Sequence, residues 1–207
     1  MISQSVKKIF RTNEIHSEDD FYLFSEKFKI VVFVPENFTE LLADSMSKAG
    51  AGVIGKYEMC SFRSEGTGTF LPLRSARPFS GSKNKLSYEK EIRLEMECGK
   101  ECLNKVINVV LKNHPYEEAV YEIYSFLKRE SSPSGKIVQL KSAVKFGDLS
   151  KRLNKRLLPE NGLNEKEFKK IIVLNSGAGK DIADSVKFAE GDCVINKSKN
   201  NFKLYIY

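Results

Sequence analysis

Two kinds of hydrophobic spacing alternate along the middle of the chain, between residues 28 and 127. Short runs of β-branched and apolar residues that end at Pro or Gly predict strands, and apolar residues three or four positions apart predict helices. The pattern predicts strands at 28–34, 57–62, 67–71, 91–96 and 119–127 and helices at 36–49 and 100–113. The resulting order β-α-β-β-α-β, with an extra hairpin, is that of a ferredoxin-like α+β domain.

A smaller α/β segment follows a turn-rich stretch. Residues 131–136, which begin Ser-Ser-Pro-Ser-Gly, favour turns and predict a linker. Beyond the linker, the spacing predicts helices at 146–158 and 181–189 and strands at 170–174, 193–195 and 202–207. We therefore expect an N-terminal extension (1–27), a ferredoxin-like domain (28–130), the linker (131–136) and a partial α/β segment (137–207).

The N-terminal extension contains apolar residues that this division leaves unassigned, namely Ile9, Phe10, Phe21, Tyr22 and Phe24. Acidic residues after Ser17 favour a short helix at 18–26, because carboxylates suit the positive end of a helix. The apolar strands of the C-terminal segment need cover, since large exposed apolar patches are unusual on monomers. Either the extension or a second copy of the protein supplies that cover, and we favour the extension.

Composition narrows the classes of partner. The chain has 207 residues, of which 41% are hydrophobic, and this content is enough for packed cores. The formal charge of +7 is spread among acidic residues and includes no run of five basic residues, so we do not expect nucleic acid as a partner. The sequence contains no apolar stretch of roughly 18 residues and no signal-peptide core. We therefore expect a soluble, cytoplasmic protein without membrane contact.

A glycine-rich motif and a His-Pro motif carry the strongest family signal. Glycines between apolar β-formers at 50–68 allow a close backbone approach. The sequence His-Pro-Tyr-Glu-Glu at 114–118 ends the second predicted helix, because proline moves the residue before it out of the helical region. These motifs resemble the inserted domain of the Nif-three-like family, whose members often carry the name GTP cyclohydrolase I type two homologue. The matching residues are Gly50, Gly52, Ile54, Gly55, Tyr57, Cys60, Ser61, Phe62, Gly66, Gly68, Phe70, Pro72, Pro78, Gly81, His114, Pro115, Tyr116, Glu117, Glu118 and Tyr121.

For residues 28–130 the resemblance implies a fold like that of the PII signalling proteins and the CutA divalent-cation-tolerance proteins. Residues 137–207 look like part of the family's C-terminal core, in which a strand enters a Gly-rich turn and then a helix. That core is similar to a dinuclear metal-hydrolase site built from histidines and carboxylates of two halves. Here no histidine follows His114, and too little sequence precedes residue 28 to form the first half.

We therefore predict a non-enzymatic, oligomeric regulatory or adaptor module with no catalytic residue, no metal ligand and no cofactor. The alternative that the family implies is a metal-dependent hydrolase of a nucleotide or cyclic phosphate, and only this alternative requires a divalent metal. Self-association follows from the same resemblance, because ferredoxin-like sheets leave edge strands exposed and PII-like relatives close theirs around a threefold axis. We expect a trimer formed through residues 28–127.

Basic residues beside the glycine-rich turn predict a site for an anionic small molecule, because arginine suits phosphate oxygens. The candidates are Arg63, Gly66, Gly68, Arg74 and Arg77. The alternative is a solvated loop that packs on a neighbouring subunit.

His114 has two possible roles. It lies at the negative end of the predicted helix, where a cation is stabilised, so it can cap that helix with Tyr116 packed beneath it. Alternatively His114, Glu117 and Glu118 contribute to an interface or to a weak divalent-cation site.

A second candidate anion site lies in the turn before the helix predicted at 181–189. Backbone N–H groups at the start of a helix can hold a phosphate or another anion. The candidate residues are Ser176, Gly177, Gly179 and Lys180. A purely structural turn is the alternative.

Overall fold

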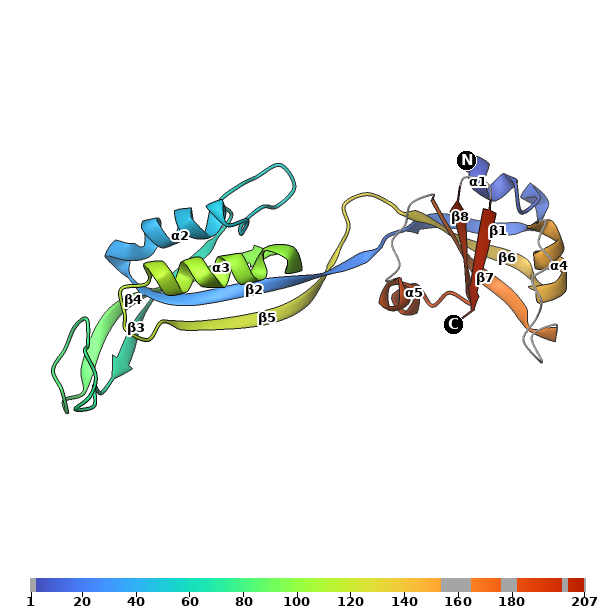
Figure 1. The fold of residues 1–207 in the computed structure, drawn as a ribbon. Helices are drawn as coiled ribbons and strands as arrows, with labels where there is room; N and C mark the ends of the chain where they lie inside the picture. The colour runs from blue at the N-terminus through green and yellow to red at the C-terminus, as the bar shows by residue number, and fades with distance from the viewer. Residues whose placement is uncertain (1–2, 154–164, 176–181, 199–200, 207) are drawn as a thin grey trace. The chain divides into compact units, whose positions relative to one another are not determined.

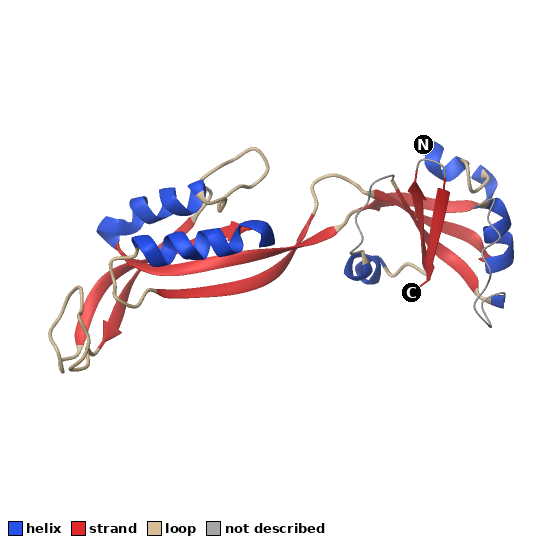
Figure 2. Ribbon diagram, viewed as in Figure 1, coloured by secondary structure: helices blue, strands red, loops and turns tan. Residues whose placement is uncertain are grey.

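The computed structural model describes residues 3–153, 165–175, 182–198 and 201–206. The chain divides into two compact units, each with its own sheet and helices (Figures 1 and 2). Residues 26–128 form one, here named the central unit. Residues 1–25 and 129–207 form the other, the terminal unit. The fold class is therefore mixed α+β with two sheets.

The central unit has a four-stranded sheet in the order β3-β4-β2-β5. Its elements are β2 (Phe24–Pro35), the 3-10 helix η2 (Glu36–Phe38), α2 (Thr39–Lys48), β3 (Phe62–Phe70), β4 (Ser87–Cys98), α3 (Lys100–Asn113) and β5 (Val120–Arg129). Both β2 and β3 pair with β4 in antiparallel register. The two α-helices lie side by side on one face of the sheet (Figure 1).

The core of the central unit fills the space between its sheet and helices. Val32 and Leu94 are register partners on β2 and β4, and both are buried beneath Val106 and Val110 of α3. The chain turns from α2 through Gly50, whose φ of 107° is in the region that favours glycine. A Cβ at this position would lie 2.6 Å from Cys102 Sγ, so the glycine also lets the backbone approach α3 closely.

The prediction of an extra hairpin, with strands at 57–62 and 67–71, is wrong. The structure has one strand, β3, across residues 62–70, and its two internal glycines stay in register with β4. Residues before it form a tight turn in which Ile54 and Tyr57 exchange backbone hydrogen bonds of 2.9 and 3.0 Å. Met59 has a φ of 56°, in the left-handed region, so the chain turns inside the stretch 57–62 that the apolar pattern suggested as a strand.

The terminal unit has a five-stranded sheet in the order β1-β6-β7-β8-β9. Its elements are α1 (Gln4–Lys7), the 3-10 helix η1 (Thr12–Glu14), β1 (Ile15–Phe21), β6 (Gly135–Lys145), α4 (Phe146–Arg152), β7 (Glu167–Leu174), α5 (Ala183–Ala189), β8 (Cys193–Ser198) and β9 (Asn201–Ile206). β7 and β8 are parallel, and the other neighbouring strands are antiparallel. Alternate residues of β7 enter two separate cores, with Ile171 and Val173 in one and Ile172 and Leu174 in the other.

The N-terminal residues belong to the terminal unit. Two expectations about this unit, a helix at 18–26 and a linker at 131–136, differ from the structure. Residues 15–21 form strand β1 rather than part of a helix at 18–26, because β1 pairs with β6 along its length. The last two residues of the linker expected at 131–136 belong to β6, which begins at Gly135. Val6 and Phe10 are buried with strands β6 and β7, so the N-terminal segment covers part of the C-terminal sheet, as we favoured.

No helix in the described part of the chain is both long and apolar enough to span a bilayer. The helix predicted at 146–158 begins as expected, and its last residues lie outside the described ranges.

Candidate functional site

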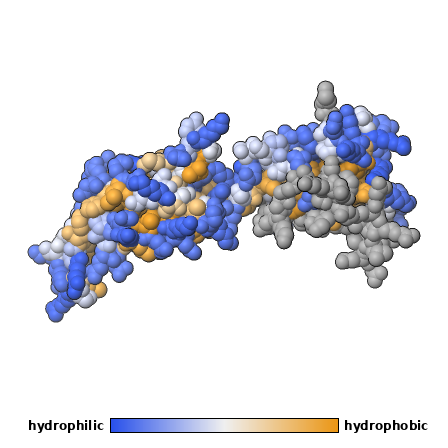
Figure 3. Space-filling view, turned by 45° about the horizontal axis from the view of Figure 1, so that its top comes forward, coloured by the Kyte–Doolittle hydropathy of each residue, from blue (hydrophilic) through white to orange (hydrophobic). Residues whose placement is uncertain are grey.

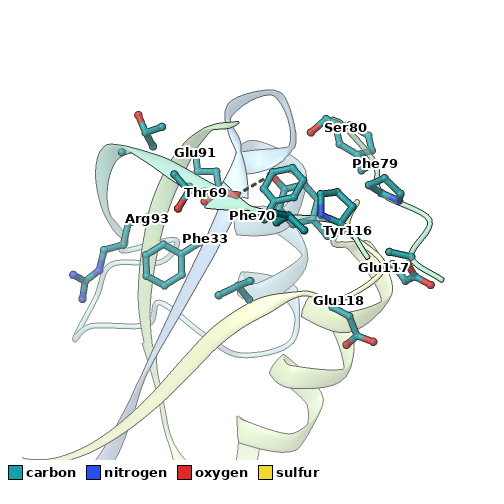
Figure 4. Close-up of a pocket in the computed structure, with 18 of the residues that line it drawn as sticks. Phe33, Thr69, Phe70, Phe79, Ser80, Glu91, Arg93, Tyr116, Glu117 and Glu118 are labelled. Atoms are coloured by element: carbon teal, nitrogen blue, oxygen red, sulfur yellow. Dashed lines mark hydrogen bonds between the residues drawn. The ribbon is translucent and has the colours of Figure 1, made fainter. Parts of the chain in front are cut away.

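A cleft of about 1050 Å³ opens in the central unit. It is lined by β3, the adjoining residues of β4, the loop 71–80 and the segment 116–122 (Figure 4). Alternation along β4 puts Ile92 and Leu94 in the core beneath the helices and turns Glu91 and Arg93 to the opposite face. The cleft therefore lies on the face of the sheet that the two helices leave uncovered.

The walls of the cleft are mainly apolar and its charges are mainly acidic. The apolar lining includes Phe33, Phe70, Leu71, Leu73, Phe79 and Val120. The charged lining consists of Glu65, Glu91, Glu117, Glu118, Glu122 and a single basic residue, Arg93.

Aromatic and backbone contacts hold the loop after β3 in place. The ring of Phe79 lies between those of Phe38 and Tyr116, with centroid distances of 5.6 and 5.9 Å. The backbone N–H of Arg77 donates to Glu117 Oε2 over 2.8 Å, which ties the loop to the segment after α3. The loop is thus a fixed wall of the cleft, secured at two points.

His114 does not line the cleft but contacts two residues that do, Phe33 and Tyr116. Its Nδ1 accepts a hydrogen bond of 3.1 Å from the backbone N–H of Tyr116, so Nε2 carries the proton and donates to Phe33 O over 2.9 Å. Burial lowers the pKa of His114, and the neutral ring matches this bonding pattern. The ring packs edge-on against Tyr116 at 4.9 Å between centroids. Because both ring nitrogens are hydrogen-bonded, this arrangement favours a positioning role for His114 over a role as a metal ligand. The expected helix cap was a positively charged imidazole, whereas this hydrogen bonding requires a neutral one.

Tyr116 connects His114 to Glu91, a residue of β4 that lines the cleft. Its phenol donates to Glu91 Oε1 over 2.8 Å, and Glu91 is only 8% exposed. Burial and the neighbouring Glu91 carboxylate raise the pKa of Tyr116 well above its usual range, so the phenol remains a donor. A Cβ on Gly68 would overlap the other carboxylate oxygen of Glu91. Gly68 therefore gives the carboxylate the space that it occupies.

The structure brings together only some of the candidate residues. Gly66, Gly68, Glu117 and Glu118 line the cleft. Arg63 is ion-paired with Glu40 of α2, on the helix-covered side of the sheet. Arg74 and Arg77 are exposed in the loop and do not line the cleft. The turn residues Ser176, Gly177, Gly179 and Lys180 lie outside the described ranges.

Sequence reasoning missed Glu91 and Phe79 as site residues. The alternation of charged and apolar residues along 91–96 indicates that Glu91 faces away from the core, but it gives no sign that Glu91 is buried on the other face beside Tyr116 and Gly68. Across the described residues, no group of three or more His, Cys, Asp or Glu side chains is arranged to hold a metal ion.

Comparison with known proteins identifies relatives of this chain. No protein-family model matches it. A protein of Halalkalibacterium halodurans named GTP cyclohydrolase 1 type 2 homolog is 33% identical over 165 residues, which are 77% of this chain and 44% of that protein.

Two solved structures are similar to parts of this chain. A Bacillus cereus protein related to NIF3 has a TM-score of 0.47 at 27% identity, covering 92% of this chain and 52% of its own. The periplasmic divalent cation tolerance protein CutA from Archaeoglobus fulgidus has a TM-score of 0.36 at 15% identity, covering 48% of this chain and 82% of its own. The chain spans less than half the length of the curated relatives that it matches. The sequence matches place it in the Nif-three-like family, among the GTP cyclohydrolase 1 type 2 homologues.

Proposed function

We propose that the central unit is a ferredoxin-like module of the PII and CutA kind, that it assembles as a trimer, and that the protein acts as a non-enzymatic regulatory or adaptor module. The order β2-α2-β3-β4-α3-β5, with the sheet order β3-β4-β2-β5 and both helices on one face, supports the ferredoxin-like assignment.

The observation that carries self-association is the state of the two edge strands. β3 and β5 are exposed along most of their length, whereas the inner strands β2 and β4 contain the buried core residues. Phe62 on β3 is 65% exposed and Tyr124 on β5 is 50% exposed. The surface of the central unit shows apolar areas in Figure 3. Exposed edges of this kind are templates for pairing with another chain.

A cyclic arrangement covers both edges at once. If β3 of one copy meets β5 of the next, each interface is head-to-tail, and a closed ring leaves no edge free. Three copies is the number that the resemblance to PII-like proteins implies. The regulatory or adaptor role rests on the same resemblance.

Substitution of an edge residue tests this arrangement. Phe62→Glu introduces a charge at the β3 edge and is expected to convert the assembly to monomers in analytical ultracentrifugation. Leu111→Glu is the matched control, because Leu111 is 52% exposed but belongs to α3 and not to either edge strand. Dissociation by both substitutions, or by neither, contradicts assembly through the β3 edge.

The rival function is a metal-dependent hydrolase of a nucleotide or cyclic phosphate. It comes from the name of the relatives, GTP cyclohydrolase 1 type 2 homolog, of which this chain covers less than half. Elemental analysis of the purified protein separates the two proposals. About two tightly held transition-metal ions per chain, as in dinuclear hydrolases, would favour the hydrolase.

A further inference from the structure

We propose that the cleft of the central unit binds a small organic cation, with an ammonium or guanidinium group at Glu91 and an apolar body against the aromatic wall. This inference goes beyond self-association but rests on the proposed edge-to-edge arrangement, because β3 and β5 also line the cleft and the face of the sheet must stay open between their edges. Its ligand has the opposite charge to the one expected from the sequence.

The charges that line the cleft favour a cation. Five glutamates and one arginine line it. Arg93 is paired through Nε with Glu95 Oε1 over 3.1 Å, and Glu65 is paired with Lys90 Nζ over 3.8 Å, which leaves four glutamates without an ion pair among the described residues. The basic residues that suggested an anion site, Arg63, Arg74 and Arg77, are absent from the lining. An anion would therefore meet net negative charge.

Glu91 supplies the specific contact. Glu91 is 8% exposed, and its Oε1 accepts one hydrogen bond from the neutral Tyr116 phenol. Within the described ranges, Oε2 has no hydrogen-bond donor and the carboxylate has no ion-pair partner within 4.0 Å. A carboxylate that is mostly buried is stabilised by a second, charged donor, so an ammonium or guanidinium group at Oε2 would add a charge-assisted hydrogen bond to the one from Tyr116.

The rest of the cleft suits the apolar part of such a ligand. Phe33, Phe70 and Phe79 line it together with the acidic residues, and Figure 4 shows Glu91 close to Phe70 and Tyr116. Aromatic faces attract ammonium and guanidinium groups, and a mostly apolar pocket with a few polar groups is the usual form of a small-molecule site. Its volume, about 1050 Å³, has room for an aryl or alkyl chain.

Three probes of equal shape and different charge test the proposal on the full chain at neutral pH. These are phenylbutylamine, which is cationic, phenylbutanol, which is neutral, and phenylbutyrate, which is anionic. Isothermal titration calorimetry is expected to show the amine binding at least about tenfold more tightly than the alcohol, because a hydrogen bond to a charged group contributes more than about 1.4 kcal/mol. The acid is expected not to bind measurably.

Matched variants locate the site. Glu91→Gln keeps the side-chain shape and removes the charge, so the preference for the amine over the alcohol is expected to disappear. Glu58→Gln makes the same charge change at an exposed position outside the cleft and is expected to bind as the unaltered protein does. Gly68→Ala is expected to weaken amine binding without changing the charge, because the new methyl group displaces the Glu91 carboxylate.

Circular dichroism of each variant separates loss of binding from loss of folding. Equal binding of all three probes, preference for the acid, or an amine preference that survives Glu91→Gln in a folded protein would overturn the proposal. An equal loss in Glu58→Gln would show that net charge, and not this cleft, attracts the amine.

Discussion

The phenol of Tyr116 donates a hydrogen bond to the buried carboxylate of Glu91 over 2.8 Å, and this contact joins two segments 25 residues apart in the sequence. Tyr116 also packs against Phe79 of the loop and against the ring of His114. One side chain thus links strand β4, the loop after β3 and the end of α3.

Removing the phenol is expected to destabilise the central unit. Tyr116→Phe keeps the ring contacts and leaves Glu91 without its donor, at an expected cost of about 1–3 kcal/mol. Tyr124→Phe is the control, because the Tyr124 phenol donates to Glu122 at an exposed site and its loss is expected to cost little. Urea unfolding of the two variants measures the difference, and equal stabilities would show that the Glu91 contact is unimportant.

Two glycines of β3 are expected to differ in their tolerance of alanine. A Cβ on Gly68 displaces the Glu91 carboxylate, whereas a Cβ on Gly66 meets no atom within 4 Å. Both substitutions gain the same strand propensity, so Gly68→Ala should be less stable than Gly66→Ala by about 1 kcal/mol, the contribution of one hydrogen bond. Thermal unfolding of the pair measures this difference. The reverse order would contradict the placement of Glu91 against Gly68.

Protonation of His114 is expected to weaken the fold. Its pKa is lowered in the folded protein by burial, so the unfolded chain binds the proton more readily. The stability that the neutral ring contributes is complete above the unfolded pKa of about 6.5 and is lost as the pH falls through the lower folded value.

Unfolding free energies measured between pH 7 and 5 test this dependence. His114→Gln is expected to reduce the loss of stability on acidification, and His16→Gln, at an exposed position of β1, to leave it unchanged. A profile that is the same in both variants would exclude His114 as its cause.

The N-terminal segment is expected to stabilise the terminal unit. Phe10 is 2% exposed in the core that also contains Phe168 and Val138, so Phe10→Ala should cost about 3–5 kcal/mol. Hydrogen exchange measures the two units separately. Loss of protection in β6 and β7 with unchanged protection in β2 and β4 is the expected result, and a uniform loss or no loss would contradict the assignment.

The elements with strong local patterns could be predicted from the sequence. The helix expected at 100–113 is α3, because its apolar spacing, its start at Gly99 and the proline after His114 all act locally. β1 could not be predicted, since only the two ends of Ile-His-Ser-Glu-Asp-Asp-Phe are buried and its conformation depends on β6, more than a hundred residues away. Long-range pairing overrides local preference in such strands.

The candidate site was predictable only in part for the same reason. Gly68, Glu117 and Glu118 could be singled out from their motifs. The predominance of acidic side chains in the cleft could not, because it depends on which side of the sheet each residue faces. Arg63 pairs with α2 on one side, while Glu91 enters the cleft on the other.

Self-association of the central unit is the central claim, and light scattering of the unaltered chain tests it most directly. We expect the mass of three chains at micromolar concentration, unchanged on moderate dilution, because paired strand edges and their exposed apolar side chains are buried together. The mass of a single chain under the same conditions would contradict the claim.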